Sequence, residues 1–305
     1  MPSRSIAPRC SLPSWPPGRW MGLGLLVIYA LACAQPLMAQ TDDAATLSPT
    51  NLSQSGSAAD PVILGRPDGS LRVYWWDSFD GVTMVEGRMG AWSAPVVTPI
   101  ILVEELERPT PDGDTYAYTP ISTMPEIVGD GLGAAHAFWL GEEDEQTGAH
   151  PVLYSRMDAD GRAWSTPRTV VASASTFVAR GAVSGGAHLA YVRDLDTPEA
   201  PAGLYYVRSS TDGRSWEAAS SVQSSRYYRL LSPEEADLDM VASRWRGVSV
   251  TWRHPHLEQV MLSRMVPGES EWRSPVVVGL PDAPSIRGRF LTVTGTLASS
   301  PWLIW

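Results

Sequence analysis

One unit recurs four times along this chain and restricts its fold more than any other feature. The copies are GRMGAWSAP, SRMDADGRAWSTP, VRSSTDGRSWEAA and SRMVPGESEWRSP, at Gly87–Pro95, Ser155–Pro167, Val207–Ala219 and Ser263–Pro275. In the last three, Arg156, Arg208 and Arg264 each precede a tryptophan by eight residues, whereas Arg88 precedes Trp92 by four. Recurrence at intervals of roughly 50 to 70 residues predicts similar units that bury their apolar faces against their neighbours.

A second pattern recurs at the same intervals as the first. Alternating strands closed by an aromatic residue lie ahead of the four units, at Leu71–Trp75, Ala135–Trp139, Ala187–Tyr191 and Val248–Trp252, and a fifth, Pro301–Trp305, ends the sequence. Short apolar runs and Gly-rich turns precede them, so each unit predicts four strands joined by turns. We therefore predict an all-β fold, a β-propeller with five blades of four antiparallel strands.

The fifth blade has only two strands of its own, around Phe290–Thr294 and Pro301–Trp305. Segment Thr46–Ser55 resembles the fourth-strand runs, because a proline is combined with alternating apolar residues. We predict that it completes the last blade as an N-terminal strand, so that the propeller extends over residues 46–305 without exposed sheet edges. A sequence truncated after Trp305 is the alternative.

Residues 1–39 have the composition of a signal peptide. A basic leader without acidic residues precedes an apolar stretch, Met21–Ala34. We place cleavage after Ala39; a rival site lies at Ala32–Ala34, and lipidation at Cys33 is a weaker alternative. Residues 40–45 form a flexible lead-in. The predicted location is the periplasm or the extracellular space, and we expect no membrane span.

The charge of the chain limits the classes of molecule that it is expected to bind. Its 23 basic residues face 33 acidic ones, which gives a net charge of −10. Such a surface repels phosphate backbones, so nucleic acid and anionic membranes are not expected partners. Both cysteines, Cys10 and Cys33, lie in the leader, so the mature protein would have no disulfide. We expect no cofactor.

Two of the repeats carry a further motif, with the residues Asp160, Gly161 and Trp164, and Asp212, Gly213 and Trp216. These DGRAW and DGRSW units resemble the Asp-box, or BNR, repeats of the sialidase superfamily over roughly Thr46 to Trp305. The Asp usually stands two places before the Gly in that family, but is adjacent here. We expect each Asp carboxylate to accept N–H bonds within its turn, and each tryptophan to be largely buried between neighbouring sheets.

The four-strand units also predict two different faces. Turns between strands one and two and between strands three and four emerge on one side, which we call the short-turn face. The other connections form the long-loop face: Pro99–Met124, Gly141–Pro151, Arg193–Gly203, Gln223–Asp237 and Arg253–Glu258. Binding residues gather on such loops, and the sialidase resemblance implies the same face.

The first ligand-binding candidates are two tyrosines and two arginines of one long loop: Arg226, Tyr227, Tyr228 and Arg229. Aromatic rings stack on sugars and guanidinium groups pair with carboxylates, so this set suits an acidic glycan. In the alternative reading, one tyrosine packs inward and the arginines meet nearby carboxylates: Glu234, Glu235 or Asp237. A second candidate wall comprises Arg108, Tyr116 and Tyr118.

Other polar groups offer weaker alternatives. The acidic run Glu142–Glu145 could bind calcium, but most such runs are solvated loops. His254 and His256 could supply two ligands to a metal ion, but the sequence shows no third ligand beside them, and we predict no metal there. His136 and His188 recur at one strand position, which indicates a structural role.

Sialidase chemistry is not evident from the motifs, since the early Phe/Tyr-Arg-Ile-Pro motif and a late tyrosine nucleophile are both missing. We predict a secreted, non-catalytic sialidase-like propeller that binds a glycan or a protein through its long-loop face. The alternative is a divergent exo-acting glycoside hydrolase of the exo-alpha-sialidase type.

Overall fold

The computed structural model describes residues 50–88, 90–105, 117–198, 200–230, 236–244, 247–254, 256–257, 259–278, 291–293 and 302–304. These residues form strands and one short 3-10 helix, so the fold is all-β as predicted. The predicted signal peptide at 1–39 and lead-in at 40–45 lie outside them. Within the described residues, no helix is long and apolar enough to cross a membrane.

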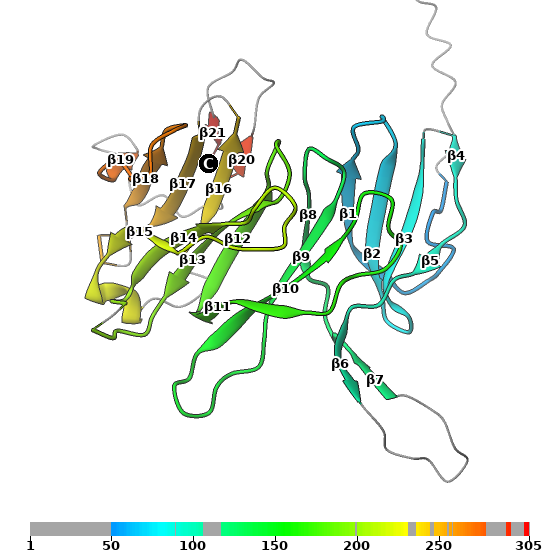
Figure 1. Cartoon of the computed structure of the whole chain (residues 1–305), viewed down its shortest axis with the longest axis horizontal. Coiled ribbons are helices and arrows are strands. Elements are labelled where there is room, and N and C mark those ends of the chain that lie inside the picture. Colours follow the sequence, from blue (N-terminus) through cyan, green and yellow to red (C-terminus); the bar gives the residue numbers. More distant parts are fainter. Residues whose placement is uncertain are drawn as a thin grey trace, which may run out of the picture. The chain divides into compact units, whose positions relative to one another are not determined.

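Four antiparallel sheets follow one another along the chain (Figure 1). The first contains β1 (Ala58–Gly65), β2 (Leu71–Asp77), β3 (Gly81–Arg88), β4 (Ala91–Trp92) and β5 (Val96–Val97). The second contains β8 (Glu126–Gly129), β9 (Ala135–Leu140), β10 (His150–Met157) and β11 (Arg168–Ala174). The third contains β12 (Thr176–Gly181), β13 (Ala187–Arg193), β14 (Gly203–Arg208) and β15 (Ser220–Ser224). The fourth contains β16 (Asp239–Ser243), β17 (Gly247–Arg253), β18 (Val260–Met265) and β19 (Val276–Val278).

Five shorter elements complete the description: two strand pairs and one helix. Strands β20 (Leu291–Val293) and β21 (Trp302–Ile304) pair with each other, as predicted for the start of a fifth unit. Strands β6 (Ile101–Glu105) and β7 (Ala117–Pro120) form a hairpin inside the first long loop, which the sequence did not predict. The 3-10 helix η1 (Arg226–Leu230) connects the third and fourth sheets.

Each sheet packs on the next through apolar side chains. Tyr74 and Met84 of the first sheet meet Trp139 of the second, and Phe138 of the second meets Leu189 of the third. A further cluster joins the third and fourth sheets and includes Leu204, Tyr206, Val250 and Trp252. The first strands also contact one another in series: β1 with β8, β8 with β12, β12 with β16 and β16 with β20. Successive meanders with adjacent first strands are the arrangement of propeller blades.

The repeated spacing has a structural cause. In the last three repeats, the residue after the tryptophan donates its backbone N–H to the carbonyl oxygen of the repeated arginine nine residues earlier, for example Ser165 to Arg156 at 2.8 Å and Glu217 to Arg208 at 3.0 Å. In the first sheet, Ser93 donates instead to Glu86 at 2.9 Å. Glu86 is therefore the structural equivalent of the repeated arginine, and Arg88 is not, because the first turn is shorter by two residues.

The repeated tryptophans lie between neighbouring sheets, as predicted, but they are less buried than predicted. Trp164 contacts Tyr74 of the preceding sheet, with ring centroids 5.8 Å apart, and Trp216 lies edge-on to Tyr154 at 5.2 Å. Both indoles are only partly buried. Each comes from a turn at the surface, so one side of the ring stays near solvent.

The two DGR turns differ in the bond that was expected from their aspartates. Asp212 accepts the Arg214 N–H at 3.0 Å, and Gly213 has a positive φ of 66°. Asp160 is exposed and, within the described residues, accepts no comparable bond. In the third-sheet turn, Ser210 stands two residues before Asp212 and donates its hydroxyl to that carboxylate. In the second-sheet turn the equivalent residue is Asp158, so Asp160 has a carboxylate in place of a hydroxyl donor.

The predicted closing strand is not found in the part of it that is described. Residues 50–55 form no strand, and Thr46–Pro49 lie outside the described residues. Leu52 packs against the first sheet, and Ser55 Oγ donates to Asp77 at 2.6 Å. Local side-chain bonds explain this, since Asn51 Oδ1 accepts from Ser53 Oγ at 3.0 Å and such bonds compete with strand pairing.

Candidate functional site

The loop that carries the first sequence candidates folds as the 3-10 helix η1. Tyr227 is partly exposed and stacks on His256 of the neighbouring loop, with ring centroids 4.4 Å apart and planes 6° from parallel. The Arg226 guanidinium lies 5.6 Å from the centre of the Tyr227 ring. Arg226 and Arg229 are exposed. We call Arg226, Tyr227, Arg229 and His256 the long-loop patch.

Tyr228 does not belong to this surface, and its prediction as a ligand-binding residue is corrected. Its side chain is fully buried between the third and fourth sheets. Its hydroxyl donates to Gln223 Oε1 at 2.8 Å, and Trp252 Nε1 donates to the same oxygen at 3.1 Å. Burial raises the pKa of the Tyr228 hydroxyl, which keeps it a neutral donor. One tyrosine packs inward, as the alternative reading stated.

A buried histidine holds the patch in place. His254 Nδ1 accepts the backbone N–H groups of His256 and Leu257, each at 3.2 Å. Burial lowers the pKa of His254, and the nearby His256 lowers it further, so the ring stays neutral and can accept these bonds. His254 therefore orients the backbone that carries His256.

The remaining loop candidates contribute less. Arg108 and Tyr116 lie outside the described residues, and Tyr118 is described only as part of the backbone of β7. Asp237 pairs with Arg253 at 2.6 Å, not with an η1 arginine, while Glu234 and Glu235 are outside the described residues. Asp144 Oδ1 accepts the backbone N–H of Thr147 at 2.9 Å, which lowers its pKa and caps its own loop. Among the residues described, no three potential ligands gather into a metal site.

Sequence reasoning missed a charged cluster on three consecutive first strands. Arg180 of β12 donates to Glu126 of β8 at 3.3 Å and to Asp239 of β16 at 2.5 Å. Glu126 and Asp239 are the first residues of their strands, so both lie toward the long-loop face. Glu126 and Asp239 occupy equivalent positions of their first strands, opposite Phe138 and Thr251, whereas Arg180 lies opposite His188 in the third sheet. The third sheet has Val178 at the position equivalent to the two carboxylates, so the acidic residue does not recur in every repeat.

The electrostatics of Glu126 are unusual. Burial raises the pKa of its carboxyl group to about 7, although the Ala179 N–H and Arg180 both act to lower it. The Asp239 charge adds to the rise. Its side chain still keeps 32% of its surface exposed. A carboxyl group that titrates near neutrality can exchange a proton with a ligand.

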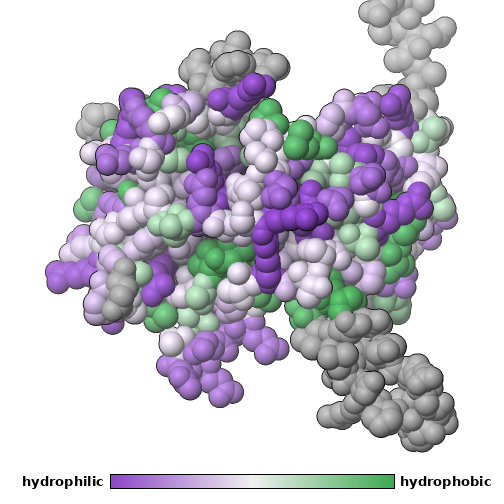
Figure 2. Space-filling model, viewed as in Figure 1, coloured by the Kyte–Doolittle hydropathy of each residue, from purple (hydrophilic) through white to green (hydrophobic). Residues whose placement is uncertain are grey.

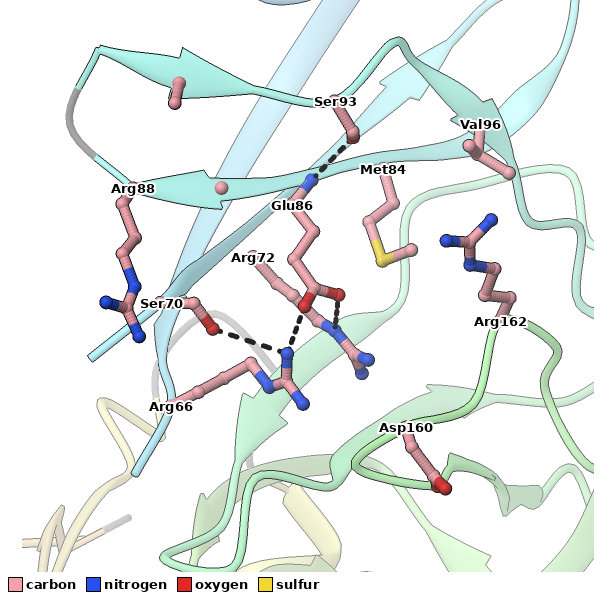
Figure 3. A pocket seen from close by; sticks show the side chains of 12 residues that line it. Arg66, Ser70, Arg72, Met84, Glu86, Arg88, Ser93, Val96, Asp160 and Arg162 are labelled. Carbon is pink, nitrogen blue, oxygen red and sulfur yellow. Dashed lines mark hydrogen bonds and ion pairs between the residues drawn. The ribbon is translucent and has the colours of Figure 1, made fainter. Parts of the chain in front are cut away.

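The short-turn face holds a cavity that sequence reasoning also missed (Figure 3). Its volume is about 650 Å³, and it lies where the first sheet meets the turn between β10 and β11. Four arginines line it: Arg66, Arg72, Arg88 and Arg162. A smaller cavity of about 230 Å³ lies at the junction of the third and fourth sheets, beside His188 and Arg208.

Comparison with known proteins gives only distant likenesses. No family model and no curated protein matches the sequence. A lectin from Burkholderia pseudomallei is similar at 14% identity and a TM-score of 0.45, over 76% of this chain and 59% of the lectin. An alpha-L-arabinofuranosidase from Clostridium thermocellum is similar at 12% identity and a TM-score of 0.40, over 72% of this chain and 73% of the enzyme. The fold assignment therefore rests on the strand pairing and sheet packing described above.

Proposed function

We propose that this protein is a secreted, non-catalytic glycan-binding module that binds its ligand through the long-loop patch. The stacked pair of Tyr227 and His256 carries the proposal, because its near-parallel rings offer a preformed aromatic surface. The exposed Arg226 and Arg229 add positive charge beside it, which favours a carboxylated glycan. The face of the molecule drawn in Figure 2 is mostly hydrophilic, with small hydrophobic groups between the polar side chains.

We further infer that the molecule is a five-unit propeller of the sialidase type. The serial contacts of first strands from β1 to β20 support a fifth unit, and the turn around Asp212 and Gly213 supports an Asp-box origin. The basic and apolar leader supports export of the chain.

A glycan array probed with the purified full chain tests the binding proposal. We expect signals on acidic glycans, and we expect Tyr227→Ala to weaken them about fivefold or more, since loss of a stacked aromatic surface costs roughly 1 kcal/mol or more. Phe79→Ala is the matched control, because Phe79 is 89% exposed in the loop between β2 and β3 on the same face of a different sheet. Equal losses in both variants would contradict the proposed position.

The arginines have a separate test. The double variant Arg226→Gln, Arg229→Gln should lose acidic glycans while its melting temperature stays nearly unchanged, because both side chains are exposed. Unchanged binding of acidic glycans by this variant would remove the arginines from the site.

Glycoside hydrolysis is the second candidate function, favoured by the Glu126 and Asp239 pair and by the raised pKa of Glu126. It ranks below binding because Arg180 is bonded to both carboxylates. Chromogenic glycosides, including sialosides, distinguish the two. Turnover that is abolished by Glu126→Gln would establish the hydrolase, whereas binding without turnover supports the module.

A further inference from the structure

The cavity on the short-turn face has a charge opposite to that of the whole chain. Its lining holds four arginines and two carboxylates, Glu86 and Asp160, so four positive minus two negative charges leave a formal excess of two. The chain as a whole has a net charge of −10. A positive concave site in an acidic molecule concentrates anions locally.

Two of the arginines are fixed at the base of the cavity by both sheets. Arg72 is only 2% exposed, and its Nε donates to Glu86 at 3.0 Å. Arg66 also pairs with Glu86, so one carboxylate is shared by two guanidinium groups. The Nη2 atoms of Arg66 and Arg72 each donate to the Ala159 carbonyl of the second sheet at 2.6 Å. Figure 3 shows these side chains converging from the first sheet.

The other two arginines are at the rim. Arg88 is exposed and donates one N–H to the Asp68 carbonyl at 2.6 Å, which leaves further donors on the same fork. Arg162 extends from the opposite side of the cavity in Figure 3, and within the described part of the chain it makes no ion pair. Met84 and Val96 supply an apolar wall between them. The rim can therefore bind an anionic group whose attached body rests on apolar side chains.

A comparison of the sheets explains why this space is open. Arg168 follows Trp164 by four residues, as Val96 follows Trp92. At the junction of the second and third sheets, Arg168 crosses to the next turn, donates to the Gly213 carbonyl at 2.6 Å and lies 5.2 Å from the Tyr154 ring centre. The shorter Val96 cannot span the same distance at the preceding junction. The cavity therefore lies at the junction of the first and second sheets where valine replaces the arginine that fills the next junction.

We propose that this cavity is a second ligand site, distinct from the long-loop patch, which binds a sugar acid of monosaccharide size with its carboxylate at Arg162. The volume of about 650 Å³ lies within the range of small-molecule sites and far exceeds the needs of an inorganic ion. The paired donors of guanidinium groups match a planar carboxylate.

Calorimetric titration of the full chain with glucuronate, glucose and sulfate tests the proposal. We expect saturable binding of glucuronate that weakens as salt is added, because the attraction is partly electrostatic. Glucose should bind at least tenfold more weakly, since it lacks the carboxylate. Sulfate that competes with glucuronate at equal affinity would overturn the proposal, because the site would then recognise only an anion.

Variants localise the binding. Arg162→Gln should weaken glucuronate about tenfold or more, through loss of charge-assisted hydrogen bonds. Arg214→Gln is the matched control, because Arg214 holds the same place in the third-sheet motif and is likewise exposed. Val96→Arg should fill the cavity and abolish binding, whereas Val96→Ala should keep it.

Two outcomes would refute the site: retained glucuronate binding in a folded Val96→Arg variant, or equal losses in Arg162→Gln and Arg214→Gln. Tyr227→Ala should leave glucuronate binding at this cavity unchanged. The proposal for the cavity can therefore fail independently of the proposal for the long-loop patch.

Discussion

Glu126 begins the first strand of the second sheet with a carboxyl group whose pKa burial raises from 4.5 to about 7. The folded protein therefore holds this proton more tightly than the unfolded chain does, and the resulting stabilisation is complete below about 4.5 and lost as pH rises through about 7. Arg180 and Asp239 are the charged groups that face it. We expect the difference in melting temperature, wild type minus Glu126→Gln, to decrease as the pH is raised from 5 to 8, a range chosen around that pKa. Circular dichroism measures both melting temperatures. A difference that is constant with pH would place the pKa of Glu126 near its ordinary value.

At the scale of elements, the turn that carries Trp216 connects two sheets through one indole. The ring lies edge-on to Phe138 at 5.9 Å and to Tyr154 at 5.2 Å. Trp216→Ala should lower the free energy of unfolding by about 2 kcal/mol or more, toward the lower side of the roughly 3 to 5 kcal/mol lost by fully buried aromatics, because the ring is partly exposed. Trp216→Phe should lose less than half as much, since the buried Nε1 makes no hydrogen bond within the described residues. Urea denaturation measures both, and equal losses would show that contacts other than the aromatic ones dominate.

The same elements show what the sequence could and could not predict. The aromatic-closed strands became β2, β9, β13, β17 and β21, because short apolar and aromatic runs between turn residues specify strands locally. That β2 and β9 are buried on nearly their whole length follows from packing between sheets, which the local pattern does not specify. The inward tyrosine of η1 could not be chosen, since neighbouring residues of a single helical turn point to different sides and only the packing of Tyr228 decides. The cavity depends on Val96 standing where another sheet has Arg168. That contrast is visible in the aligned repeats, but its consequence requires knowing that Arg168 crosses between sheets.

At the scale of the whole molecule, the junctions between sheets differ in how firmly they are joined. The second and third sheets share a buried polar bridge in addition to their apolar cluster: Asp130 accepts the Gly186 N–H across the junction at 2.9 Å and pairs with His136 at 3.1 Å. Burial acts to raise the pKa of Asp130, but the bonds from His136 and the backbone outweigh it and lower the pKa. By contrast, β1 is mostly exposed, with Ile63 at 67%. A serial array in which units contact mainly their neighbours opens first where its junctions are weakest.

Amide hydrogen exchange should reveal this order. We expect the slowest exchange in β9, β10, β13 and β14, which lie on either side of the bridged junction, and the fastest strand exchange in β1. Asp130→Asn should remove about 1 to 3 kcal/mol of protection from both sheets together, because an amide nitrogen cannot accept the bonds that the second carboxylate oxygen accepts. The bridge would then couple the two sheets as one cooperative unit. Faster exchange confined to β8 and β9, with the third sheet unchanged, would mean instead that Asp130 stabilises only its own turn and that the apolar cluster alone joins the sheets.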